Sequence, residues 1–226
     1  MDRPYIHINC AASVDGKISR PDGSRLRISS EWDMRRVHRL RAEMGSILVG
    51  AGTIIMDDPK LTVKEEHSGR KVELNKIVLD GKGRIPATSG FLTTPGRSYV
   101  VTSESPNSIW LDSMRDLAGG DNGIEIIEIP GEDGVIDVGK ILEELKRIGI
   151  GSILVEGGSN IIWEFVSGGY FDKITIYFGP ILVGGSGPGI ASGDGFSGEP
   201  MGLVLTNTLI TEEGGILVEY RKGAGR

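Results

Sequence analysis

The chain of 226 residues contains one cysteine and three histidines, and it has no long apolar run. A single cysteine, Cys10, excludes an internal disulfide and any metal site built from several cysteines, which fits a reducing cytoplasm. No apolar stretch is long enough to span a bilayer, and the first residues lack the apolar segment of a signal peptide. We therefore expect a soluble, cytoplasmic protein that holds no metal.

An excess of basic residues is also missing. The formal net charge is −6, and no stripe of lysine and arginine is present, which argues against a nucleic-acid partner. A phosphorylated substrate stays possible because the local charge of a pocket can oppose the net charge. The chain lacks a P-loop and a Gly-x-Ser-x-Gly turn. It also lacks the His-x-Glu and Pro-Cys-x-x-Cys motifs of zinc deaminases, and this absence excludes their reaction.

The histidines do not form a cluster. His7 is expected in a strand, His38 on a helix and His67 in a charged loop, each with a structural or solvated role. The chain is instead rich in glycine, with 35 residues distributed among turns rather than collected in a linker. We therefore look for chemistry at the turns.

Strand-like and helix-like patterns alternate along the chain. Apolar strand patterns lie at 6–14, 47–49, 77–79, 99–102, 124–129, 152–155 and 174–178. Helical spacing of apolar residues lies at 30–44, 107–117, 138–148 and 160–166, with Ser29 or Ser30 as the cap of the first helix. The segments 203–210 and 216–220 are typical of a hairpin.

This alternation predicts an α/β fold in one domain, residues 1–226. Its sheet is mostly parallel with helices on both faces, and an antiparallel hairpin follows at the C-terminal end. Residues 62–75 and 184–200 are expected to be long surface loops.

In such sheets, ligands bind beyond the carboxyl ends of the parallel strands. Three glycine turns qualify. The run from Leu48 to Thr62 passes from a strand into Gly50-Ala51-Gly52-Thr53 and then Asp57-Asp58, where free amides, a hydroxyl and a carboxylate suit a nucleotide. The same run also fits a plain turn in which Thr53 caps a helix.

The second turn follows the strand 153–155 as Glu156-Gly157-Gly158, and its amides could bind a pyrophosphate. The alternative is an ordinary helix start capped by Ser159. The third turn, Gly184-Gly185-Ser186-Gly187, is not a dinucleotide fingerprint and alone fits a flexible loop. Together the three turns favour one extended cofactor groove.

Five motifs in this order resemble the riboflavin-biosynthesis reductases, in particular the stand-alone archaeal and fungal type. They are Asn9 to Ile18, Val37 to Ala42, Gly50 to Thr62, Val155 to Gly158 and Gly184-Gly185. The resemblance covers nearly the whole chain and implies a dihydrofolate-reductase-like fold and a homodimer. It also implies the NADPH-dependent reduction of 2,5-diamino-6-ribosylamino-4(3H)-pyrimidinone 5′-phosphate, with NADH as a possible alternative cofactor.

The resemblance also implies roles for single residues. Cofactor contacts fall on Thr53, Asp57, Gly157, Gly158, Gly184, Gly185, Ser186 and Gly187. Substrate contacts fall on Arg41, Leu61, Lys64 and Glu156, and Lys17 and Glu156 are the candidate catalytic pair. The family often has arginine at the position of Lys64, and lysine keeps the charge but loses the bidentate fork. At Arg25-Leu26-Arg27 the chain departs from the family pattern, and no role is carried over.

Two alternatives remain open. A true dihydrofolate reductase would share the fold and the cofactor, but Lys17, Arg41 and Lys64 suit a phosphate better than a p-aminobenzoyl group. A nucleotide-binding module without catalysis would keep the groove, although Lys17 and Glu156 argue against it. Lys82 and Arg84 could hold the 2′-phosphate of NADPH, but the residues alone do not separate NADPH from NADH.

Overall fold

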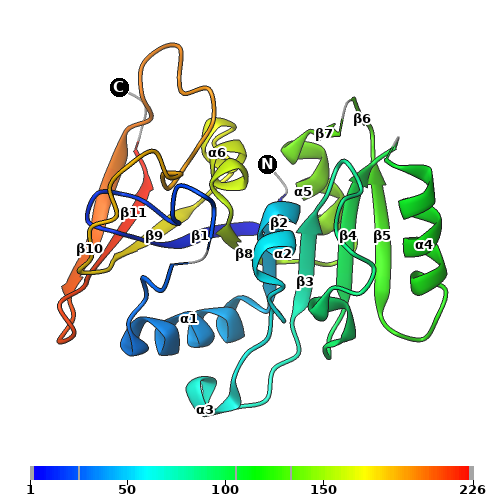
Figure 1. Ribbon diagram of the computed structural model, residues 1–226, viewed down its shortest axis with the longest axis horizontal. Coiled ribbons are helices and arrows are strands. Elements are labelled where there is room, and N and C mark those ends of the chain that lie inside the picture. The colour runs from blue at the N-terminus through cyan, green and yellow to red at the C-terminus, as the bar shows by residue number, and fades with distance from the viewer. Residues whose placement is uncertain (1–2, 25, 105, 133, 224–226) are drawn as a thin grey trace. The chain divides into compact units, whose positions relative to one another are not determined.

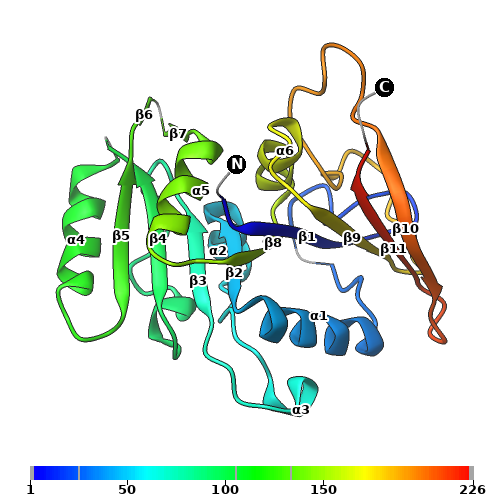
Figure 2. The same cartoon turned by 180° about the vertical axis from the view of Figure 1, so that it is seen from behind.

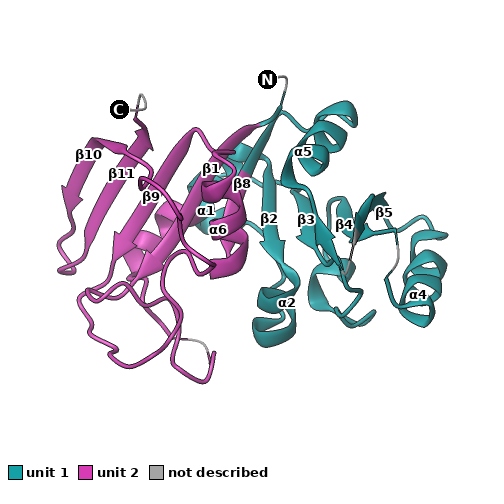
Figure 3. Ribbon diagram, turned by 90° about the horizontal axis from the view of Figure 1, so that it is seen from above, with its two compact units in different colours: residues 1–4, 38–153 teal, residues 5–37, 154–226 magenta. Residues whose placement is uncertain are grey.

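The computed structural model describes residues 3–24, 26–104, 106–132 and 134–223, so Arg25 lies outside the described residues. The chain forms two compact units (Figure 3). Unit 1 comprises Met1–Pro4 and His38–Ile153, and unit 2 comprises Tyr5–Val37 and Leu154–Arg226. Helix α1 (Glu31–Met44) and strand β8 (Ser152–Gly157) each contain a boundary between the units. The expected single domain stays a prediction.

Unit 1 contains four parallel strands in the order β2-β3-β4-β5, labelled in Figure 1. They span Ser46–Gly50, Asn75–Leu79, Ser98–Ser103 and Ile124–Ile129. All are rich in β-branched residues, and β2 and β4 are buried along their whole length, as expected for strands of a covered parallel sheet. A small antiparallel pair, β6 (Gly131–Glu132) and β7 (Val135–Ile136), follows.

The helices of unit 1 are α2 (Ala51–Asp57), α3 (Glu65–Ser68), the 3₁₀ helix η1 (Gly90–Thr93), α4 (Ser108–Ala118) and α5 (Val138–Arg147). Side chains of Asn107 and Asp137 cap α4 and α5 by accepting backbone N–H groups. Helix α4 lies along β5 in both views (Figures 1 and 2). The core of unit 1 includes Ile54, Leu61, Val78, Phe91 and Val100, so α2 and η1 pack into the same core as the sheet.

Unit 2 contains the strand order β10-β11-β9-β1-β8. In it, β1 (Tyr5–Ala12) runs parallel to β9 (Lys173–Phe178). Strands β10 (Leu203–Ile210) and β11 (Ile216–Lys222) form an antiparallel hairpin, and β11 also pairs antiparallel with β9. Helix α6 (Ser159–Ser167) directly follows β8 and buries Ile162 and Phe165.

The predicted α/β class, the mostly parallel sheet and the C-terminal hairpin are confirmed. Ser30 caps α1, because its hydroxyl accepts the N–H of Asp33 at 3.2 Å. Four short elements escaped prediction: α3, η1, β6 and β7 are each too short to show a period. His67 therefore lies in helix α3 rather than in a loop, which corrects that expectation.

His7 belongs to a buried polar network of unit 2. Its Nε2 lies 2.7 Å from Thr175 Oγ1, and the hydroxyl of Thr175 donates to Glu219 Oε1 at 3.5 Å. The ammonium of Lys173 lies 2.7 Å from the same Glu219 oxygen. Burial, followed by the positive charge of Lys173, lowers the pKa of His7 to about 4. The imidazole is therefore neutral in the folded protein at neutral pH.

Because of this network, the free energy of unfolding depends on pH in the acidic range. The pKa of an unfolded histidine is about 6.5, so the unfolded chain binds the extra proton first as the pH falls. The contribution of neutral His7 is complete above pH 6.5, and roughly 3 kcal/mol is lost as the pH falls through the folded pKa of about 4. We expect His7→Gln to lose less unfolding free energy than wild type between pH 7 and pH 4, as measured by urea unfolding. Equal losses in the two proteins would contradict this origin.

Candidate functional site

The first glycine turn connects β2 to helix α2 in unit 1. The cap position is Gly50, in extended conformation, and no side chain caps the helix. Thr53 is the third residue of α2 and is half-buried, so the alternative in which it caps the helix was wrong. Asp57 is the last residue of α2 and is exposed. Because Thr53 and Asp57 are four residues apart in a helix, they share one face.

The segment after α2 has an unusual backbone. Asp58 (φ 38°) and Leu61 (φ 49°) are the two non-glycine residues with positive φ in the described part of the chain. Such conformations carry a strain of about 1–3 kcal/mol each and persist where the surroundings hold them. Leu61 is 3% exposed and belongs to the core of unit 1. The predicted substrate contact at Leu61 therefore sits on a strained but firmly packed turn.

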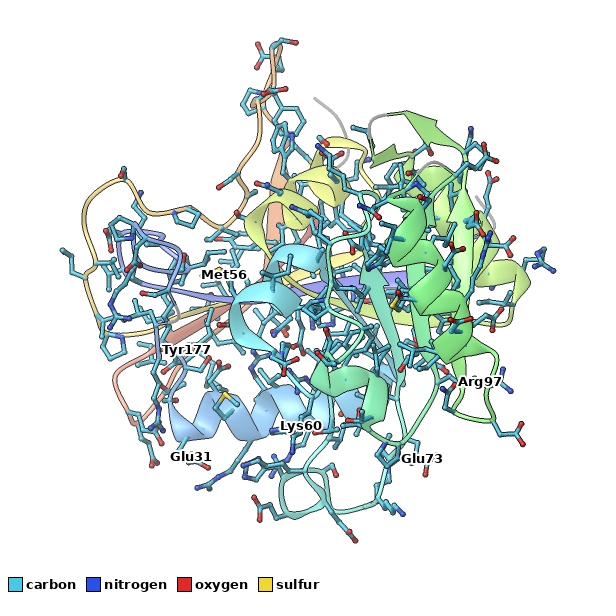
Figure 4. The ribbon with its side chains drawn as sticks, turned by 45° about the vertical axis from the view of Figure 1, so that its right-hand side comes forward. Glu31, Met56, Lys60, Glu73, Arg97 and Tyr177 are labelled. Atoms are coloured by element: carbon cyan, nitrogen blue, oxygen red, sulfur yellow. The ribbon has the colours of Figure 1, made fainter. Side chains whose placement is uncertain are left out.

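Hydrogen bonds fix this segment from several sides. Asp58 Oδ1 accepts the N–H of Gly90 at 2.7 Å, and the hydroxyl of Thr94 lies 3.1 Å from the carbonyl oxygen of Lys60. Figure 4 labels Met56 on α2 and Lys60 in the segment that follows. The 3₁₀ helix η1 and the residue after it thus contact both ends of the turn 58–60.

Helix α1 fixes the next residues. Arg41 donates from Nη1 to the carbonyl oxygen of Thr62 at 2.9 Å, and the N–H of Lys64 donates to Nδ1 of His38 at 3.3 Å. Nδ1 of His38 is therefore the acceptor nitrogen of a neutral ring. The ammonium of Lys64 is exposed and lies 3.7 Å from Glu66. The structure thus brings Arg41 to the segment that carries Leu61 and Lys64, and the substrate role of these three residues stays a prediction.

In unit 2, the second glycine turn follows β8. Glu156 is half-buried between the buried Val155 and Gly157. Gly157 has a φ of 139°, a conformation that residues with a side chain rarely adopt. Gly158 is the cap position of α6 and no side chain caps this helix, so the alternative of a Ser159 cap was wrong. The backbone therefore requires glycine where the cofactor was predicted to approach.

Lys17 lies in a tight turn that pairs with the chain just after the third glycine turn. The N–H of Lys17 donates to Ser13 Oγ at 2.9 Å, and Lys17 forms an isolated antiparallel bridge with Gly189. Gly184 and Gly185 have φ values of 72° and 67°. A Cβ on Gly187 would lie 2.9 Å from the carbonyl oxygen of Ser19. Close approach to the 13–20 segment, rather than flexibility, thus explains part of this glycine-rich sequence.

Asp15 connects these two segments, and the sequence prediction missed it. Its two carboxylate oxygens accept the N–H groups of Val183 at 3.0 Å and Gly184 at 2.7 Å, and the Ser13 hydroxyl at 2.7 Å. These bonds, with that of Val183 foremost, lower the pKa of Asp15 to about 2. The Asp15-Gly16 turn signal beside Lys17 was visible in the sequence, but its partner is 169 residues away.

This contact refines the cofactor prediction at Gly184. Because the N–H of Gly184 already donates to a carboxylate, a pyrophosphate would have to use other amides of the 184–187 segment. The described residues contain no group of three or more His, Cys, Asp or Glu side chains arranged for a metal ion. Among those same residues, no helix is long and apolar enough to cross a membrane.

The sheet, the hairpin and the strand-end turns define an α/β protein with a dihydrofolate-reductase-like fold. The chain matches the model of the RibD C-terminal domain over residues 4–214 and belongs to that family. It is 37% identical over 202 residues to the 2,5-diamino-6-ribosylamino-4(3H)-pyrimidinone 5′-phosphate reductase of Archaeoglobus fulgidus, covering 86% of this chain and 89% of that protein.

A second relative carries the same name in Methanothermobacter thermautotrophicus, with 34% identity over 183 residues and 81% of each chain covered. Among solved structures, Acinetobacter baumannii RibD aligns with a TM-score of 0.81 and 24% identity. That alignment covers 99% of this chain but 59% of the RibD chain, and it shows the fold.

Proposed function

We propose that this protein reduces 2,5-diamino-6-ribosylamino-4(3H)-pyrimidinone 5′-phosphate to its ribitylamino product in riboflavin biosynthesis. The observation that carries the proposal is the match to the Archaeoglobus reductase, which extends over most of both chains. A spectrophotometric assay of reduced nicotinamide with this substrate tests it. The same assay is run separately with dihydrofolate. Turnover of dihydrofolate without turnover of the pyrimidine phosphate would contradict the proposal.

The proposed reaction needs a hydride donor and control of one proton. Reduced nicotinamide, once bound, would supply the hydride for C1′ of the ring-opened imine of the substrate. Opening the ribosylamine ring requires an acid, or a positioned water, near the ring oxygen. We assign Lys17 and Glu156 jointly to this step and to orientation of the ribosyl group. Arg41 and Lys64 supply positive charge for the 5′-phosphate.

The proposed cofactor is NADPH, held by Thr53, Asp57 and the glycine turns at 157–158 and 184–187. Arg84 is the candidate for the 2′-phosphate; its side chain is 56% exposed, and its Nε lies 3.6 Å from Asp80 Oδ1. Running the assay with NADPH and with NADH separates the two cofactors. A higher kcat/KM with NADH would overturn this choice.

One prediction tests the α2 turn. Replacing both Thr53 and Asp57 with alanine should raise the KM for reduced nicotinamide, because a hydroxyl and a carboxylate on one helix face are lost. Asp116→Ala, an exposed change on α4, is the matched control. Circular dichroism establishes folding of each variant. An unchanged cofactor KM in the folded double variant would remove this turn from the site.

We also propose a cytoplasmic homodimer. Strand β10 is the outermost strand in its unit, and all eight of its residues are exposed. Five of them are large and apolar: Leu203, Val204, Leu205, Leu209 and Ile210. Exposed apolar edge strands tend to be covered by a partner. Sedimentation equilibrium measures the mass. The cytoplasmic assignment is supported by the single, buried Cys10.

A further inference from the structure

Lys76 is a buried cation that the proposed reaction does not use. It lies in β3, and its side chain is among the largest that are fully buried in the described part of the chain, with 0% exposure. Burial lowers its pKa to about 8, so the ammonium remains protonated at neutral pH. A buried charge is costly, and an apolar side chain of similar volume would fill the space without that cost. Packing alone therefore does not explain a lysine here.

The three protons of the ammonium have three acceptors. Nζ lies 2.8 Å from the carbonyl oxygen of Phe91, 2.7 Å from that of Thr94 and 2.9 Å from Thr94 Oγ1. Charge-assisted hydrogen bonds of this kind are stronger than neutral ones. Lys76 thus holds Phe91 of η1 and Thr94, the residue after η1, against β3.

Thr94 passes this restraint to the candidate site. Its hydroxyl oxygen accepts from Lys76, and its single proton has two carbonyl oxygens within reach, that of Phe91 at 2.9 Å and that of Lys60 at 3.1 Å. At the other end of η1, the N–H of Gly90 donates to Asp58. The first residue of η1 and the residue directly after η1 therefore contact Asp58 and Lys60, within the strained segment 58–61 that follows Asp57.

We propose that Lys76 is a positioning residue: its buried ammonium, acting through Thr94 and η1, holds the turn 58–61 and thereby places Asp57 and Leu61 for ligand binding. This inference rests on the proposed function for the identity of the ligand. The restraint itself involves residues of unit 1 alone and can be measured without any substrate.

Two variants test the restraint. Thr94→Val removes the hydroxyl that connects Lys76 to Lys60 but keeps both carbonyl acceptors, and Lys76→Met removes the charge. Lys71→Met, at an exposed lysine of unit 1, is the matched control. Hydrogen exchange followed by mass spectrometry should show exchange in peptides covering 58–64 faster by roughly tenfold in both variants, with β4 unchanged.

The kinetic readout separates positioning from general destabilisation. We expect the KM for reduced nicotinamide to rise about fivefold while kcat at saturation changes little, because the bound ligand restores the turn. Wild-type exchange at 58–64 in Thr94→Val would overturn the proposal, and so would faster exchange with an unchanged KM. If Lys76→Met does not fold, the exchange rates and the cofactor KM of Thr94→Val alone test the proposal. If the wild-type protein does not turn over the pyrimidine phosphate, the proposed function is contradicted. The hydrogen-exchange rates at 58–64 still test whether Lys76 restrains this segment.

Discussion

Replacing Glu156 with glutamine is expected to lower kcat by roughly 10²-fold or more, with little change in the KM for reduced nicotinamide. Glutamine keeps the shape and hydrogen-bonding reach of the side chain but removes its charge and basicity. The location supports a large effect, because Glu156 is half-buried at the carboxyl end of β8, next to a glycine that the backbone requires. Steady-state kinetics with saturating cofactor measures the change.

The matched control is Glu164→Gln, an exposed glutamate on α6 in the same unit, which should leave kcat unchanged. Lys17→Ala should behave like Glu156→Gln, and the double variant should lose less than the product of the single losses if the two residues act as a unit. Near-normal kcat in Glu156→Gln would defeat the assignment. Alignment of substrate and nicotinamide would then be the main source of catalysis.

The elements that were predicted correctly are those whose own residues carry the signal. Strand β4 has β-branched residues at its centre and is buried along its whole length, and α5 places Val138, Ile141, Leu142 and Leu145 on one buried face. Ser30 was predicted as a cap because its acceptor role is local. Short elements were not predicted because they carry too little local signal. Helix α3, for example, has four residues, fewer than are needed to display a helical period.

The caps that were wrong show a second limit. Thr53 and Ser159 have good capping side chains, yet Gly50 and Gly158 take the cap positions just before α2 and α6. In both turns a glycine brings bare backbone to the strand end. A preference for Ser or Thr is worth about 1 kcal/mol, which the requirement for close backbone approach can exceed.

The contacts that shape the candidate site lay beyond sequence reasoning. Asp15 accepts a hydrogen bond from a residue 169 positions away, and Lys76 donates to residues up to 18 positions away. No local sequence pattern predicts such partners. The family resemblance supplied the site residues but not what holds them. The side chains that meet the ligand therefore stay predictions, whereas the contacts that position them are visible only in the structure.

Arg41→Ala is expected to weaken substrate binding by about 2–3 kcal/mol, since a charge-assisted pair of hydrogen bonds to the phosphate is lost. This corresponds to a substrate KM higher by roughly 30- to 150-fold, with a far smaller effect on the cofactor. Arg41 is half-buried and fixed to the carbonyl oxygen of Thr62, so its guanidinium is held in place before the substrate arrives. An arginine carries five donors, and one bond to Thr62 does not preclude a phosphate.

The loss of the Thr62 bond must be separated from the loss of a phosphate ligand. Thermal unfolding measures the first, which is worth about 1 kcal/mol for a single hydrogen bond. Substrate lacking the 5′-phosphate measures the second, because wild type and Arg41→Ala should bind it with similar affinity. Arg35→Ala, an exposed change on α1, is the control and should leave both substrates unaffected. If Arg41→Ala binds the phosphorylated substrate as well as wild type does, Arg41 only anchors the 62–64 segment, and Lys64 becomes the remaining candidate for the phosphate.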